Sequence, residues 1–205
     1  MAVISGGTTL IDNGTLDAAV PTGSLILLST QTASASASIS FTSGIDSTYD
    51  SYVFKFINIH PGTDWNNWFA FQGSTNGGST YGVTVTNTAF RPYHNEAGNQ
   101  SGLSYLDSYD QAQSTAFIRL CEDTSSANAD ENLSGYVQIF NPSNTTFVKH
   151  YIGRSQTGVA KVGQVYSIDW HGAGYFNTTS ALDAFQFKMN SGNIDDGIIK
   201  MYGVK

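Results

Sequence analysis

Two short segments of the sequence place an acidic side chain beside a histidine, which is a pairing that general acid–base catalysis uses. They are His94-Asn95-Glu96 and Asp169-Trp170-His171. Neither segment carries a nucleophile motif, and the chain contains no GxSxG, HExxH, phosphate-binding-loop or dinucleotide-binding pattern. Histidines that hydrogen-bond to backbone atoms explain both segments better. We therefore expect no catalytic residues, no enzymatic activity and no cofactor.

A group of carboxylates between residues 122 and 132 has the oxygen-rich composition that calcium prefers. The carboxylates are Glu122, Asp123, Asp130 and Glu131, with Asn128 and Asn132 among them. Their spacing does not match an EF-hand loop. A solvated acidic loop is the simpler interpretation. We therefore predict no bound metal and keep these carboxylates as the alternative calcium site.

Five aromatic residues outside the main strand patterns are candidates for an exposed binding surface. They are Trp65, Trp68, Tyr105, Tyr109 and Trp170. Exposed aromatic rings stack on sugars or pack in protein interfaces. The alternative is that they fill the core, since the chain is 13% aromatic and aromatic rings are commonly buried.

The densest strand pattern of the chain runs from Tyr52 to Ile59. In it, Tyr52, Phe54 and Phe56 alternate with Val53, Ile57 and Ile59. Apolar residues on both parities predict a central strand that is covered on both faces. After Pro61-Gly62, the run from Trp68 to Phe71 predicts a second strand, which we expect to pair with the first as a hairpin.

Further strand patterns occupy the rest of the chain, and no amphipathic helix lies between them. The predicted ranges are 24–32, 82–93, 115–120, 135–141, 145–152, 164–171, 174–176, 182–189 and 197–204. The ranges 135–141 and 145–152 form the clearest hairpin, because Pro142-Ser143-Asn144 joins them. About ten short strands without helices predict an all-β fold, a single antiparallel β-sandwich of jelly-roll type.

Residues 1–23 differ from the rest of the chain, because short apolar groups alternate there with glycine and asparagine. The apolar side chains are Val3, Ile4, Leu10, Ile11, Leu16 and Val20. They are too few to form a core of their own and too apolar for a solvated linker. We expect an extended N-terminal anchoring arm over residues 1–23 that docks on another protein or a sister subunit, and one sandwich domain over residues 24–205.

Composition excludes several classes of partner. The net charge is −7 and only nine residues are Lys or Arg, which argues against nucleic acid as a ligand. No apolar run is long enough to cross a bilayer, and the N-terminus lacks the pattern of a signal peptide, so we expect no membrane insertion. Cys121 is the single cysteine, which excludes an internal disulfide.

Several blocks of the sequence resemble a family of virion structural proteins from marine, cyanophage-like bacteriophages. The blocks are MAVISGGTTLIDNGTLDA, DSTYDSYVFKFINIHPGTD, YHNEAG, DQAQST, FNPSNTTFVKHYI and AGYFNTTSALDAFQFKMNSGNIDDGIIKMYGVK. Members are described as tail-fibre or otherwise uncharacterised structural proteins, so the resemblance implies a component of the virus particle, assembled in the host cytoplasm. It implies no catalytic residues. The closing segment also resembles the last hairpin of jelly-roll domains in phage fibres and carbohydrate-binding modules.

The expected function is a non-enzymatic structural component displayed on a bacteriophage virion, as a tail-fibre or receptor-binding module. A head-decoration protein, a carbohydrate-binding module and, more remotely, a polysaccharide-degrading enzyme are the alternatives. The expected partners are other virion proteins, sister subunits in a homo-oligomer, with a trimer favoured, and a host-surface glycan. The sparse charge, 12% of residues, suits a protein displayed in many copies at high ionic strength.

Overall fold

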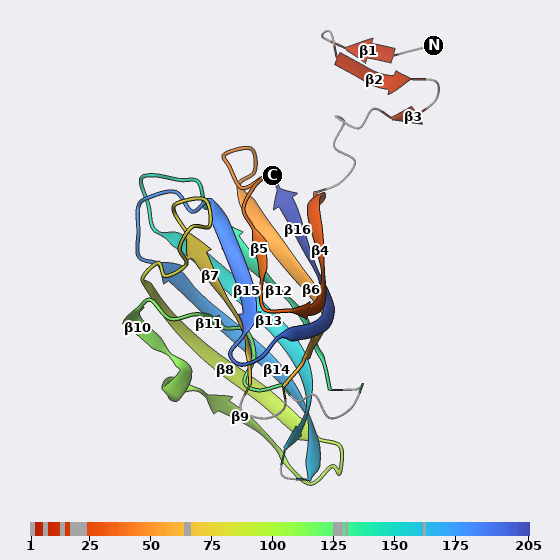
Figure 1. Cartoon of the computed structure of the whole chain (residues 1–205), viewed down its shortest axis with the longest axis vertical. Helices are drawn as coiled ribbons and strands as arrows, with labels where there is room; N and C mark the ends of the chain where they lie inside the picture. The colour runs from red at the N-terminus through yellow and green to blue at the C-terminus, as the bar shows by residue number, and fades with distance from the viewer. Residues whose placement is uncertain are drawn as a thin grey trace.

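The chain is an all-β protein whose main body is a sandwich of two antiparallel sheets (Figure 1). The structure is a computed structural model that describes residues 3–5, 8–12, 15–16, 24–63, 67–124, 129, 131–161 and 163–205. The predicted fold class, an antiparallel β-sandwich, is confirmed. The described residues include no helix long and apolar enough to cross a membrane.

The larger sheet has nine strands. Its order is β10-β8-β14-β13-β12-β6-β16-β4, and β9 pairs with β8. The strands are β4 (Ile26–Ser36), β6 (Ser51–Pro61), β8 (Val85–Asn95), β9 (Ser101–Tyr105), β10 (Gln111–Ser114), β12 (Leu133–Phe140), β13 (Lys149–Lys161), β14 (Gln164–Phe176) and β16 (Ile194–Val204). The predicted hairpin over residues 135–152 is confirmed as β12 and β13, which pair antiparallel.

The smaller sheet has four strands in the order β11-β7-β15-β5. They are β5 (Ile39–Phe41), β7 (Phe69–Ser74), β11 (Ile118–Arg119) and β15 (Ala184–Met189), and one short 3-10 helix, η1 (Asp107–Tyr109), follows β9. Figure 1 shows the smaller sheet lying across one face of the larger one. The chain passes repeatedly between the two sheets, so most neighbours within a sheet are distant in sequence.

Aromatic rings from both sheets meet in the core. The ring of Phe54 in β6 lies 5.2 Å from Phe41, 5.4 Å from Phe185 and 5.2 Å from Phe187 of the smaller sheet. Tilted and edge-to-face pairs of this kind contribute about 0.5–1.5 kcal/mol each beyond the area they bury. Ring packing between the two layers therefore contributes to the stability of the sandwich, beside the aliphatic residues of the core.

The predicted hairpin of β6 with the strand that follows it is wrong. β6 belongs to the larger sheet, whereas β7 belongs to the smaller sheet and pairs with β11 and β15. The two strands meet through their side chains instead, with the rings of Phe56 and Phe69 5.4 Å apart. The closing segment differs from a hairpin in the same way, because β15 and β16 lie in different sheets.

Only one face of β6 is covered by a layer of the described residues, and cover of the other face by a sister subunit stays a prediction. Ile59 faces the core together with Phe54, because Asn58 has a φ of 51° and the pairing with both neighbouring strands shifts there. This β-bulge moves the following residues to the opposite parity. On the other face Val53 is 8% exposed, but Ile57 is 38% exposed. That face of β6 is part of the molecular surface.

The N-terminal arm contains a small sheet, which its sequence pattern does not indicate. Strands β1 (Val3–Ser5), β2 (Thr8–Asp12) and β3 (Thr15–Leu16) pair with one another as a three-stranded sheet. Ile4 is 61% exposed. The side chains of Val3, Leu10, Ile11 and Leu16, and all of Val20, lie outside the described residues. Docking of the arm on a partner stays a prediction.

Candidate functional site

The face of the nine-stranded sheet that points away from the smaller sheet is the candidate binding surface. Along its central strands one parity is buried in the core and the other is exposed or half-buried. Among the described residues, neither strand nor helix forms a layer over this second face. We call it the outer face.

One line of side chains crosses the outer face through eight strands, and we call it the cross-sheet row. Its members, each directly opposite the next, are Tyr105, Phe90, His171, Arg154, Tyr136, Lys55, Lys200 and Thr30. Residues directly opposite each other in antiparallel strands point to the same face, so their side chains are neighbours. The row is aromatic at its β9 end and cationic beyond its middle.

The aromatic end of the row is formed by three rings. Phe90 stacks on His171, with ring centroids 4.7 Å apart and an interplanar angle of 9°. Tyr105, opposite Phe90, is 64% exposed, and its hydroxyl donates a hydrogen bond to Asp110. These rings form an aromatic border at the edge of the sheet.

The middle of the row is organised by Asp169, which lies on β14 two residues before His171. Arg154 donates two hydrogen bonds of 2.8 Å, from Nε and Nη2, to the two carboxylate oxygens. His171 Nε2 lies 3.1 Å from Asp169 Oδ2. The hydrogen bonds from Arg154 are the main reason that the pKa of Asp169 is lowered. The carboxylate therefore stays ionised and holds Arg154 and His171 in place.

A hollow of about 370 Å³ lies on the outer face between the aromatic end and Tyr136. Its lining consists of Thr88, Phe90, Tyr136, Ile152, Gly153, Arg154, His171, Gly172 and Ala173. A second hollow of about 400 Å³ adjoins it and shares Thr88, Ile152 and Ala173. Small residues thus form the floor of a groove that larger side chains border.

Comparison with protein-family models, with curated proteins and with solved structures finds no match to this chain. The geometry of the groove is therefore the basis for a functional assignment.

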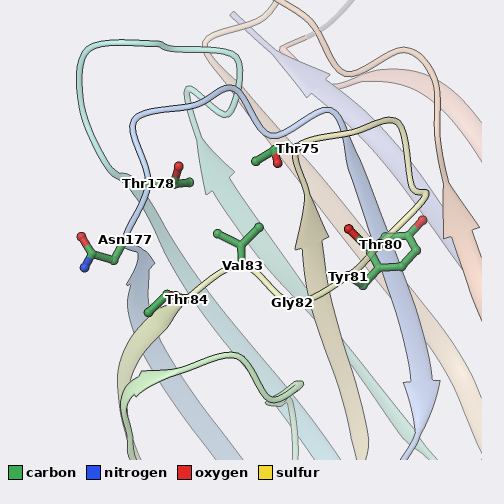
Figure 2. A pocket seen from close by; sticks show the side chains of 8 residues that line it. All are labelled: Thr75, Thr80, Tyr81, Gly82, Val83, Thr84, Asn177 and Thr178. Carbon is green, nitrogen blue, oxygen red and sulfur yellow. The ribbon is translucent and has the colours of Figure 1, made fainter.

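Another hollow, of about 440 Å³, lies beside the loop between β7 and β8 (Figure 2). Its lining consists of Thr75, Thr80, Tyr81, Gly82, Val83, Thr84, Asn177 and Thr178. Figure 2 shows Asn177 and Thr84 at one end and Thr80 and Tyr81 at the other. Asn177 is already engaged, since its backbone N–H donates to Thr84 O and its amide to Gln113. The lining contains no carboxylate, histidine or lysine, so it offers no acid–base pair.

Two of the five predicted aromatic residues differ in their exposure to solvent. Tyr105 is exposed and belongs to the cross-sheet row. Trp170 is only 2% exposed, so its assignment as an exposed binding residue is wrong. It lies on the inward parity of β14 and packs against Ala89, Leu106 and Tyr109.

Of the other three predicted aromatic residues, the structure describes Trp68 and Tyr109. Trp65 lies outside the described residues. Trp68 and Tyr109 are half-buried, and the guanidinium carbon of Arg119 lies 3.3 Å from the centroid of the first ring and 4.0 Å from that of the second. This cation–π arrangement uses the ring faces internally.

The predicted acidic loop is partly buried and carries ion pairs. Glu122 and Asp123 are 5% and 8% exposed. Arg91 forms an ion pair with Glu122, and the Lys161 ammonium lies 3.1 Å from Glu122 Oε1 and 2.6 Å from Asp123 Oδ2. The solvated-loop interpretation is therefore wrong for these two carboxylates.

The remaining acidic residues do not support the alternative calcium site. Glu131 is buried, and Asp130 lies outside the described residues. Within the described ranges, no group of three or more His, Cys, Asp or Glu side chains could hold a metal ion. Glu122 and Asp123 serve as ion-pair partners.

Sequence reasoning missed most of the groove. Phe90, Tyr136 and Arg154 were hidden in strand patterns whose outward parity looks like ordinary alternation. Asp169 and His171 were singled out as neighbours, but the interpretation as a loop histidine bonded to backbone is wrong, because both lie on β14 and His171 contacts the Asp169 carboxylate. The missing signal was the register between strands, which brings residues from distant segments into one line.

Proposed function

We propose that the chain is a non-enzymatic structural component of a bacteriophage particle, displayed on its surface, that binds a host-surface glycan through the outer face. The resemblance of its sequence blocks to virion structural proteins supports the location. The observation that carries the binding role is the groove whose floor contains Gly153, Gly172 and Ala173 and whose border contains Phe90 and Tyr136.

The chemistry of this groove suits a sugar ring. The C–H face of a sugar packs on aromatic and aliphatic side chains, and here Phe90, Tyr136 and Ile152 provide them. Sugar hydroxyls need oriented donors and acceptors at the border of the site. Arg154 and His171 supply these groups, and Asp169 holds both side chains in position before a ligand arrives.

The same residues do not support glycoside hydrolysis. That reaction uses two carboxyl groups on either side of the bond, one of them protonated. The lining of both outer-face hollows contains no carboxylate. Asp169, beside them, has its pKa lowered by Arg154, so it is ionised at neutral pH and cannot donate a proton. Burial also raises the pKa of Cys121 to about 12, so its thiol is not a nucleophile.

A glycan array with the full chain tests the binding role. Phe90→Ala and Tyr136→Ala remove the rings at the border of the groove, and each should weaken binding of the selected glycan at least tenfold. Phe147→Ala is the matched control, because Phe147 is 70% exposed and lies outside the lining of the groove. Equal loss in all three variants, or no glycan bound by the wild type, contradicts the proposal.

Gold-labelled antibodies against the chain test the location. Labelling of intact particles on the tail supports a tail-fibre or receptor-binding module, and labelling over the head supports a decoration protein. Absence of the chain from purified particles contradicts the virion assignment while leaving the binding test independent.

A further inference from the structure

Two lysines lie directly opposite each other in the cross-sheet row. Lys55 of β6 and Lys200 of β16 are register partners on the outer face, and both are half-buried. Like charges that oppose each other across a strand pair destabilise a sheet. The chain has only nine Lys and Arg residues and a net charge of −7, so this pairing is not a by-product of a basic composition.

The described residues do not neutralise this pair. Their ion pairs engage Arg91, Arg154 and Lys161, together with two histidines, but neither Lys55 nor Lys200. The Lys55 ammonium instead lies 5.4 Å from the ring centroid of Tyr202, a neighbour on β16. Among the described residues, the pair therefore has an aromatic neighbour and no acidic ion-pair partner.

One of the two rows beside the lysine pair on the outer face contains no charged residue. The adjacent parallel row consists of Thr88, Ala173, Ile152, Gln138, Val53, Tyr202 and Leu27. The row on the other side contains Asp169, which Arg154 already binds through both oxygens. A local positive potential in an otherwise acidic protein attracts anions.

The lysine pair is continuous with the groove. Between His171 on β14 and Lys200 on β16 the row crosses β13, β12 and β6. At about 4.8 Å per strand this distance is roughly 19 Å, which is longer than one sugar ring and suits a polymer lying across the strands. Arg154 and Tyr136 connect the two ends.

We infer that the ligand of the outer face is an acidic polysaccharide, with Lys55 and Lys200 forming the subsite for its carboxylate or sulfate groups. This inference rests on the proposed glycan-binding function and specifies the class of the ligand. Sugar rings lie in the groove between Phe90 and Tyr136, and an anionic substituent farther along the polymer lies between the two ammonium groups. The anion removes the repulsion within the lysine pair.

Matched polymers test the inference on the full chain. Dextran is neutral, dextran sulfate has the same backbone with sulfate groups, and alginate carries carboxylates. We expect either acidic polymer to bind at least tenfold more tightly than dextran, with an affinity that falls as sodium chloride is raised. Binding of only one acidic polymer identifies sulfate or carboxylate as the natural group.

A double variant locates the charge dependence. Lys55→Met with Lys200→Met should reduce affinity for the acidic polymer at least tenfold and leave the unfolding midpoint unchanged or higher. Lys188→Met with Lys205→Met is the control of equal charge change. Lys188 belongs to the smaller sheet, and the Lys205 ammonium lies 6.0 Å from the Tyr49 ring centroid. The control should change the affinity less than twofold.

Four results would overturn the inference. Equal binding of dextran and both acidic polymers, or an unaffected double variant, removes the anionic subsite while leaving glycan binding intact. An oligomer that dissociates only in the lysine double variant, without a change in polymer binding, assigns the lysines to a second copy of the chain. If no polymer binds and Phe90→Ala and Tyr136→Ala have no effect in the array, the proposed function itself fails.

Discussion

Asn58 of β6 and Gly197 of β16 lie side by side, and both have positive φ angles, 51° and 131°. A Cβ added to Gly197 would lie 2.9 Å from the carbonyl oxygen of Asn58 and 2.7 Å from Cδ1 of Ile59. The close approach of the two backbones at this bulge therefore depends on glycine. The bulge also turns the side chain of Ile59 toward the core.

Gly197→Ala should lower the free energy of unfolding by about 1–3 kcal/mol. Alanine has an unfavourable φ at this position, and its methyl group also makes contacts that are too short. Gly77→Ala separates the two effects. Gly77 has a φ of 68°, but a Cβ there would meet nothing within 4 Å. Urea denaturation should show a clearly smaller loss of unfolding free energy for Gly77→Ala than for Gly197→Ala. Equal losses would mean that the contacts at the bulge do not matter.

Glu122→Gln should destabilise the sandwich by roughly 3–5 kcal/mol, since it leaves the largely buried Arg91 without its carboxylate. Lys161 would lose one of its two acidic partners as well. The exposed Glu96 provides the control, and Glu96→Gln should leave the unfolding midpoint unchanged. A similar midpoint for both variants in thermal denaturation would contradict a structural role for this ion-pair cluster.

Asp169 should make a pH-dependent contribution to stability. Its pKa is lowered in the folded protein, mainly by the hydrogen bonds from Arg154. A group of this kind stabilises the fold above its unfolded pKa, about 4, and the contribution disappears as the pH falls through the folded pKa. Wild type and Asp169→Asn should therefore differ in stability at neutral pH, and the difference should shrink as the pH falls below the unfolded pKa of about 4. A constant difference across this range would exclude the carboxylate as the cause.

Deletion of residues 1–23 should leave a folded sandwich with a nearly unchanged unfolding midpoint. The strands of the arm pair with one another, and the described part of the arm contributes no strand to either sheet of the sandwich. The truncated chain should fail to enter particles or should lose its oligomeric state in sedimentation experiments. Unfolding of the truncated chain would show that the arm is part of the sandwich.

Local patterns predicted most strand positions but not their partners. The apolar run from Tyr52 to Ile59 predicts a central strand, which the structure confirms as β6 between β12 and β16. The same pattern cannot show that the next strand crosses to the other sheet, because strands of either sheet have the same local composition. Nor does it locate the bulge at Asn58, where one backbone angle changes the parity of all following residues.

The candidate site was harder to predict, because it depends on seven strand registers at once. Trp170 and His171 are adjacent in sequence, yet one is buried and the other borders the groove. Their parity could be assigned only after the inward direction of β14 was known. Lys55 and Lys200 are separated by most of the chain and become neighbours solely through the pairing of β6 with β16.

The position of β16 between β4 and β6 constrains how the protein is made. During synthesis, residues 26–61 leave the ribosome long before residues 194–204, which supply the partner edge for both earlier strands. Until then the facing edges of β4 and β6 are unpaired and open to pairing with other nascent chains. The sheet is therefore completed late, and long-range closure of this kind is slow. Cells that produce many copies at once would gain from chaperones that shield these edges during translation.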